Sequence, residues 1–136
     1  MDASSKNLQC VVVTPERAVF DEQVDFVGLP MMDGELGVLP GRAPLIGRLG
    51  YGELRTRSGD TVRRFFLDGG FAQVRSNVVT VLTNRAIRAE DIDTAAAERT
   101  LQESQAPAAT PEAKATRTKN QDRARGQLRV ARHVRG

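Results

Sequence analysis

The chain has 136 residues, of which 40% are hydrophobic, 27% charged and 4% aromatic. This length allows one domain, or a small domain with an appendage, but excludes two full hydrophobic cores. Because the chain holds one cysteine and one histidine, disulfide frameworks, Cys/His zinc sites and Ser-His-Asp or Cys-His catalytic sites are excluded within one chain. The composition predicts an aliphatic core and excludes the cysteine- and histidine-dependent sites that most enzyme classes use.

Charge is distributed unevenly along the chain, whose formal net charge is +3. Residues 1–111 hold 12 basic and 15 acidic side chains, whereas residues 112–136 hold 8 basic and 2 acidic ones. The first segment is therefore net −3 and the second net +6. No signal-peptide core and no apolar run near the ~20 residues of a membrane span is visible in the sequence. We expect a cytoplasmic protein with a mildly acidic globular unit, a basic tail and no direct membrane insertion.

Short β-type runs separated by turn residues fill the chain from residue 8 to residue 83, a pattern typical of a sandwich or barrel. Segment 30–45 contains three prolines and three glycines, which predicts a tightly routed loop. Further turns are expected at 58–60 and at 68–70, where glycine adopts left-handed dihedrals at little cost. The expected strands number eight to ten and include 8–13, 17–20, 24–29, 52–57, 61–67, 71–75 and 78–83.

The period changes from strand to helix after residue 86. The segment 87–103 is rich in Ala and Glu and spaces its apolar residues along one face, which predicts a helix from about Asp91 to Ser104. Two prolines in segment 106–111 predict a loop between helices. A second helix over 112–135 is expected to need a partner surface, because Gly126 alone costs about 1 kcal/mol relative to Ala.

Three isolated features favour structural roles over chemistry. Cys10 lies inside an apolar strand, which predicts a small buried hydrophobe. His133 is placed in a frayed tail with no partner for a metal or for catalysis. A carboxylate-only active site would need Asp33, Glu35 or Asp68, and nothing in their spacing supports one.

Segment 33–45 reads DGELGVLPGRAPL and resembles the signature loop of the epsilon subunits of F-type ATP synthases, in which Gly-Glu-Leu-Gly and Pro-Gly-His-Ala-Pro-Leu recur at this spacing. Similar motifs follow the family's order at 13–16, 69–71, 77–82, 86–88 and 91–93, and more weakly at 127–130. The resemblance implies an α+β fold: an N-terminal antiparallel β-sandwich of about ten strands, then a C-terminal α-helical hairpin. The implied domains are 1–86 and 87–136, with a proline-containing loop near 105–111.

The same resemblance implies a mechanical function. In this family the sandwich clamps onto the gamma subunit and rests on the c-ring, so that ion-driven rotation is coupled to ATP synthesis in the alpha/beta hexamer. The chain itself would catalyse nothing, hold no cofactor and lie peripherally at the cytoplasmic face of a bacterial inner membrane. Its helical arm would either brake ATP hydrolysis or be passive, folded down or extended, and the coupling ion would be a proton or sodium.

Two loop residues are candidates for contacts with these partners. Glu35 stands where the family places a carboxylate facing the c-ring; from spacing alone it is an acid solvated at a glycine turn. Arg42 stands where family members commonly carry His, in a loop that approaches gamma. Its guanidinium is always charged and offers five donors. A contact with gamma and an exposed loop arginine both stay open for Arg42.

Residues 92–97 align with a motif, Ile/Leu-Asp-x-x-Arg-Ala, by which some bacterial epsilon subunits hold ATP. Here Ala96 replaces the arginine, which removes the strongest charge-assisted hydrogen bonds of a phosphate site. The resemblance therefore gives little support for regulatory ATP binding. Asp93 is then expected to be a first-turn residue favoured by the helix dipole.

The basic residues of the tail are compatible with three different roles. They could form a latch for acidic residues of the catalytic subunits, as the family implies, a nucleic-acid patch or a solvated face. Residues 106–136 contain no aromatic side chain for base stacking, which argues against nucleic acid. The residues expected to contact the catalytic subunits are Arg123, Arg125, Arg129 and Arg132.

Overall fold

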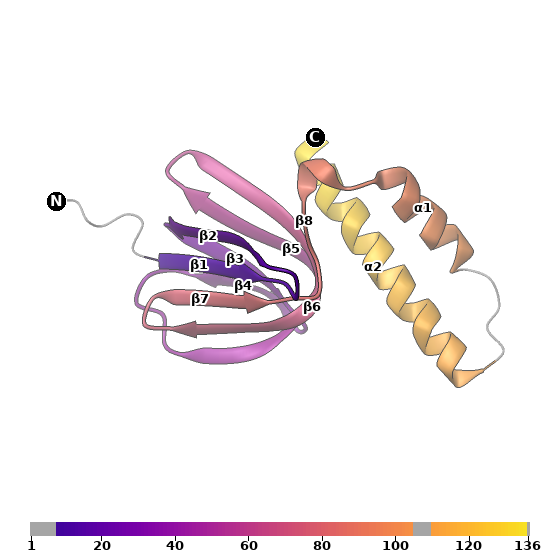
Figure 1. The fold of residues 1–136 in the computed structure, drawn as a ribbon, viewed down its shortest axis with the longest axis horizontal. Coiled ribbons are helices and arrows are strands. Elements are labelled where there is room, and N and C mark those ends of the chain that lie inside the picture. The colour runs from indigo at the N-terminus through magenta and orange to yellow at the C-terminus, as the bar shows by residue number, and fades with distance from the viewer. Residues whose placement is uncertain (1–7, 105–109, 136) are drawn as a thin grey trace.

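The computed structural model describes residues 8–104 and 110–135, and its strands gather on one side of a helical pair (Figure 1). The elements in chain order are β1 (Leu8–Val13), β2 (Ala18–Val24), β3 (Phe26–Met31), β4 (Gly34–Val38), β5 (Leu45–Ser58), β6 (Thr61–Arg75), β7 (Val78–Leu82), β8 (Ala86–Arg88), the 3₁₀ turn η1 (Ala89–Asp91), α1 (Thr94–Glu103) and α2 (Pro111–Arg135). This order confirms the predicted α+β fold of a sandwich followed by a helical hairpin.

The sandwich is one sheet folded into two layers by the long strands β5 and β6. In one layer the first half of β5 pairs with the second half of β6, and β7, β1 and β2 follow. In the other layer the remaining halves pair with each other, with β3 and β4 on one side and β8 on the other. Phe20 of β2 and Phe65 of β6 meet edge to face with ring centroids 5.4 Å apart, which joins the layers through the core.

About ten strands were expected, and the described residues form eight. The difference arises because β5 and β6 each contribute a segment to both layers. The pairs are antiparallel as expected, except that β1 and β7 run parallel.

Two expectations about the strands are wrong. The turn predicted at 68–70 is absent, because β6 continues through these residues. Gly69 and Gly70 have φ values of 68° and 113°, and a Cβ on Gly70 would stand 2.0 Å from the Leu82 carbonyl oxygen. Here glycine permits a bend and a close approach between strands, not a reversal. The loop predicted at 30–45 also contains a strand, β4, which pairs back onto β3.

The core between the layers is built mainly of Val and Leu, joined by Cys10, Phe20, Phe65 and Ala72, so it is largely aliphatic as the composition predicts. Cys10 lies fully buried in this core, which confirms its role as a small hydrophobe. Burial, and to a smaller extent the nearby Asp21 carboxylate, raise the pKa of the Cys10 thiol to about 12. The thiol is therefore neutral and inert in the folded chain.

Both helices begin at capping residues. The Asp93 side chain accepts a hydrogen bond of 3.0 Å from the Ala96 amide, so α1 begins at Thr94, three residues later than expected. Asp93 is thus the N-cap and not a first-turn residue. In α2, Thr110 Oγ1 accepts a hydrogen bond of 3.0 Å from the Ala113 amide, and Pro111 occupies the first helical position.

The arm formed by α1 and α2 docks on the sandwich through α2, which lies between the strands and α1 (Figure 1). A Cβ on Gly126 would stand 2.9 Å from both the Tyr51 carbonyl oxygen and Cε1 of Phe66. Phe66 is fully buried in a small cluster completed by Ala89, Ile92, Val130 and Ala131. The sandwich therefore supplies the partner surface that α2 needs, and Gly126 is what lets the helix approach. Among the described residues, no helix is long and apolar enough to cross a bilayer.

Replacing Gly126 by alanine tests this close contact. Alanine would raise helix propensity by about 1 kcal/mol, but overlap with a backbone carbonyl costs about 1–3 kcal/mol. We expect Gly126→Ala to weaken docking, measured as faster hydrogen exchange at residues 124–131 with an unchanged unfolding temperature of the sandwich. The control is Arg125→Ala, an exposed neighbour on the same helix. Equal protection in the two variants would contradict the role given to Gly126.

Candidate functional site

One outer face of the sandwich carries exposed apolar side chains. Phe71 of β6 and Leu82 of β7 are direct cross-strand partners, and Ile46 of β5 pairs with Gln73 on the same face. Ile46, Phe71 and Leu82 are 73%, 51% and 52% exposed, and we call these three residues the apolar face. Isolated exposed hydrophobic residues are ordinary, but neighbouring ones on a single sheet surface indicate an interaction site.

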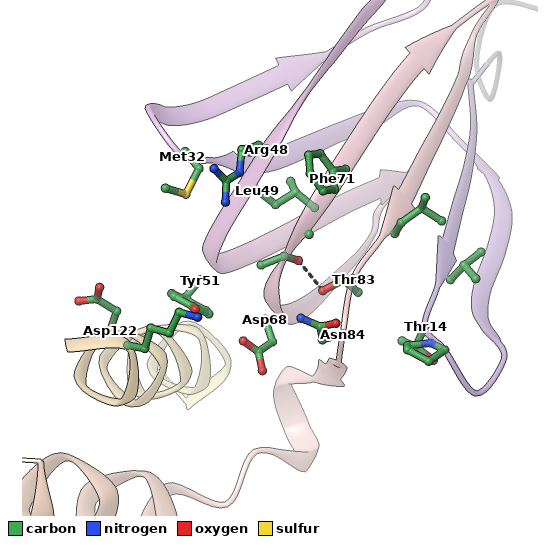
Figure 2. Close-up of a pocket in the computed structure, with 16 residues that line it drawn as sticks. Thr14, Met32, Arg48, Leu49, Tyr51, Asp68, Phe71, Thr83, Asn84 and Asp122 are labelled. Atoms are coloured by element: carbon green, nitrogen blue, oxygen red, sulfur yellow. Dashed lines mark hydrogen bonds between the residues drawn. The ribbon is translucent and has the colours of Figure 1, made fainter. Parts of the chain in front are cut away.

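A hollow of about 730 Å³ lies where the apolar face meets the docked arm (Figure 2). Phe71 and Leu82 line it from the sheet, and Lys119 and Asp122 line it from α2. Its rim also includes the exposed side chain of Met32, whose amide donates a hydrogen bond of 3.0 Å to the Arg48 carbonyl oxygen. The apolar face and α2 therefore lie next to each other and share the walls of this hollow.

Arg123 clamps the arm to the sandwich at this edge. Its Nε donates a hydrogen bond of 3.0 Å to Oδ2 of Asp68, whose side chain is 8% exposed. The guanidinium also lies 5.4 Å from the centroid of the Tyr51 ring and donates to the Asn120 side chain. A paired, hydrogen-bonded charge in a partly desolvated site contributes more than an exposed pair. In the docked arm, Arg123 is thus engaged by its own sandwich.

A second polar contact holds the C-terminal end of α2. Glu53 on β5 accepts a hydrogen bond of 2.6 Å from Arg64 of β6, and its other oxygen contacts Nδ1 of His133. The expectation that His133 sits in a frayed tail is wrong, because α2 continues to residue 135 and lays this side chain against β5. No spacing in the sequence signals a contact between residues so far apart.

The candidate contacts for the c-ring and gamma lie near opposite ends of β4: Glu35 is the second residue of the strand, and Arg42 comes after its last residue. Glu35 is exposed at the start of the strand, on the outer face of the layer that carries the arm. Arg42 is exposed in the turn after β4, where the Gly41 amide donates a hydrogen bond of 2.8 Å to Asn77 Oδ1. That turn is at the end of the sandwich away from the helices (Figure 1). The structure does not bring the two residues into one site.

The other candidate residues all lie on the helical hairpin. Arg125, Arg129 and Arg132 are exposed along α2, and the first two line a hollow that reaches Met32. Asp93 lies at the start of α1 with one oxygen occupied by the helix cap. Among the described residues, no His, Cys, Asp and Glu side chains gather in a group that could hold a metal ion.

Comparison with known proteins gives a consistent result. Residues 7–89 match the β-sandwich domain of the ATP synthase delta/epsilon chain family. The ATP synthase epsilon chain of Rhodopirellula baltica is 54% identical over 93% of this chain and 99% of its own length. The epsilon chain of a Synechococcus strain is 40% identical over 88% of this chain and 90% of its own.

A solved structure shares the fold. A chain in the Euglena gracilis mitochondrial ATP synthase, a structure of the OSCP, F1 and c-ring parts, superimposes with a TM-score of 0.78. The alignment covers 98% of this chain and 86% of that chain at 22% sequence identity. The likeness extends over both the sandwich and the helical arm.

Arg123 and Arg125 form a matched pair for testing the clamp, because each is an arginine of α2 and only Arg123 contacts Asp68. We expect Arg123→Gln to lower the free energy of docking by about 1 kcal/mol, since it removes a hydrogen bond to a charged group that is partly screened by solvent. Limited trypsin digestion should then cut α2 about fivefold faster in Arg123→Gln than in Arg125→Gln. The two variants each lose one positive charge and one trypsin cleavage site, so they differ only in the contact with Asp68. Identical rates would refute the clamp.

Proposed function

Because this chain belongs to the ATP synthase delta/epsilon chain family, we propose that its sandwich joins the gamma subunit to the c-ring in the rotating central stalk. In this role the chain transmits torque and performs no chemistry of its own. The proposed location is peripheral, at the cytoplasmic face of a bacterial inner membrane. The observation that carries the proposal is the apolar face, which lies on the layer opposite to the one that binds α2.

The apolar face is the proposed gamma contact. Exposed Ile46, Phe71 and Leu82 supply the hydrophobic centre that a stable protein interface requires. The docked arm packs against Tyr51 and Phe66 and borders this centre only at the hollow, so Phe71 and Leu82 stay about half exposed. Arg42, at the end of the sandwich away from the arm, would add a charged hydrogen-bond donor near the rim of the same interface.

Glu35 is the proposed c-ring contact. It is an exposed carboxylate beside the tight β3–β4 turn, where Gly34 has a φ of 131°. Its carboxylate lies on the outer face of the sheet, where a Cβ on Gly28 of β3 would stand 3.1 Å from Oε2 of Glu35. It can therefore accept hydrogen bonds from polar loops of a partner without disturbing the core.

The arm is the proposed regulatory element. When docked, it keeps Arg123 on Asp68 and presents Arg125, Arg129 and Arg132 to solvent. Released, it would offer all four guanidinium groups to acidic residues of the alpha/beta hexamer and so slow ATP hydrolysis. Asp93 serves as a helix cap and position 96 lacks a guanidinium, which argues that this arm works without bound ATP.

Serine substitutions on the apolar face test the gamma contact. We expect the double variant Ile46→Ser and Phe71→Ser to bind gamma at least tenfold more weakly, because exposed apolar and aromatic anchors dominate protein interfaces. Val62→Ser is the control: Val62 is 45% exposed but lies in the β5–β6 hairpin, outside the apolar face. Calorimetry gives the dissociation constants of these complexes. The proposal is overturned if the double variant binds gamma as tightly as Val62→Ser and the unmodified chain do.

Substitution of Glu35 tests the c-ring contact separately. In the assembled enzyme, Glu35→Gln should lower ATP synthesis driven by an ion gradient, while the isolated chain keeps its unfolding temperature. Glu16→Gln is the control, since Glu16 is another exposed acid in a turn. A ratio of synthesis to hydrolysis that Glu35→Gln leaves unchanged would exclude the contact, whatever the result for gamma.

A further inference from the structure

We propose that the outer face of the layer that carries the arm binds an extended acidic segment of a partner protein, through Arg55 and Arg57 held on the ring of Phe26. The segment presents two carboxylates two residues apart, which is the spacing of the two arginines along β5. This surface is separate from the apolar face, and its binding is measured on the isolated chain. The proposal therefore stands or falls independently of the gamma and c-ring contacts.

Strand pairing places the three side chains next to one another on the outer surface. In the register of β3 with β5, Arg57 stands opposite Phe26 and Arg55 stands opposite Gly28. Thr56, between the two arginines, is buried on the inner side of the strand. Alternate residues of a strand share a face and lie about 7 Å apart. The two guanidinium groups therefore extend from one face at the spacing of one strand repeat.

The Phe26 ring holds both guanidinium groups. The central guanidinium carbon, Cζ, lies 5.2 Å from the ring centroid in Arg55 and 5.4 Å from it in Arg57. A Cβ on Gly37 of β4 would stand 3.1 Å from Cε1 of Phe26, and a Cβ on Gly28 would stand 3.4 Å from Cε2, so both glycines make room for the ring. Contact with an aromatic face orders a guanidinium without using its N–H donors.

The donors of both arginines are available to a ligand. Among the described residues, no carboxylate oxygen lies within 4.0 Å of a side-chain nitrogen of Arg55 or Arg57. Asp25, which precedes Phe26, accepts a hydrogen bond of 2.7 Å from the Gly59 amide in the β5–β6 turn. An ordered guanidinium binds a carboxylate through two parallel hydrogen bonds, so this pair of arginines matches a pair of carboxylates.

The small net charge of this face favours a protein segment over a membrane or a nucleic acid. Its outward positions on β3 to β6 carry three arginines and two glutamates: Arg55, Arg57, Arg64, Glu35 and Glu53. Arg64 and Glu53 are already joined by a hydrogen bond of 2.6 Å. Bilayers and nucleic acids attract basic surfaces through many charges at long range. This face offers instead two charges at a fixed spacing, which a segment with acids at alternate positions matches.

Apolar side chains flank Arg57 on both sides. Phe26 is its partner in β3, and Val62, which is 45% exposed, is its partner in β6. A segment lying across Arg57 would cover both side chains and remove water from the ion pair, which strengthens its hydrogen bonds. Arginine and aromatic residues are enriched at protein interfaces. The surroundings of Arg57 thus supply the centre of such an interface.

Peptide binding by the full chain tests the proposal. The probe is the fluorescent, end-capped peptide Thr-Glu-Thr-Glu-Thr-Thr, and the comparison peptide, Thr-Glu-Thr-Thr-Glu-Thr, has the same composition. In an extended chain only the first peptide directs both carboxylates to one side. We expect fluorescence anisotropy at low salt to show about fivefold tighter binding of the first peptide, since two charge-assisted contacts form instead of one.

Variants assign this preference to the proposed residues. Arg55→Gln with Arg57→Gln should remove it, whereas Arg75→Gln with Arg99→Gln, which loses the same charge from exposed positions on β6 and α1, should keep it. Phe26→Leu keeps both arginines and a side chain of similar size. This variant should also lose the preference, because the guanidinium groups lose the ring that orients them.

Three results would overturn the proposal. The first is equal binding of the two peptides by the unmodified chain, and the second is a preference that persists in the variant lacking both Arg55 and Arg57. The third is binding to phosphatidylglycerol vesicles that depends on these arginines, with neither peptide bound, because the face would then be a membrane contact.

Discussion

The close approach of α2 to the sandwich at Gly126 is the constraint on which the rest of the arrangement depends. With no side chain at this position, the helix backbone comes against the Tyr51 carbonyl and the Phe66 ring. The two polar contacts follow from it: Arg123 reaches Asp68 one turn before the glycine, and His133 reaches Glu53 two turns after it. An apolar centre flanked by two polar contacts sets both the position and the rotation of the helix.

Docking of α2 on one layer leaves Ile46, Phe71 and Leu82 of the opposite layer exposed, so the proposed gamma contact and the docked arm use different faces of the chain. The apolar face is rigid, because its strands also form the wall of the core. The arm is held by a small apolar cluster and two polar contacts, so we expect its separation from the sandwich to cost far less free energy than unfolding the sandwich.

Alternation, glycine and proline punctuation and helical spacing are local signals, and they predicted a sandwich or barrel, two helices and the buried thiol. The choice of a sandwich with a helical hairpin came from the resemblance to the epsilon subunits. The sequence analysis wrongly placed Gly69 and Gly70 in a turn. Glycine is required both in a tight turn and where a strand bends close to a neighbouring carbonyl oxygen, so the residue type alone does not distinguish the two. The partners of Asp68 and Glu53 were beyond prediction, because 55 and 80 residues separate them from Arg123 and His133. Only the packing of α2 on the sheet brings these charges together.

The claim that the layer opposite the arm carries the interface can be tested most directly by hydroxyl-radical footprinting of the chain alone and bound to gamma. The account predicts that oxidation of Ile46, Phe71 and Leu82 falls sharply in the complex, because these side chains lose the exposure they have in the free chain. Val62, in the β5–β6 hairpin, should be oxidised equally in both samples. Unchanged oxidation of the apolar face, with protection of Phe26 or Glu35 on the other layer instead, would contradict the account.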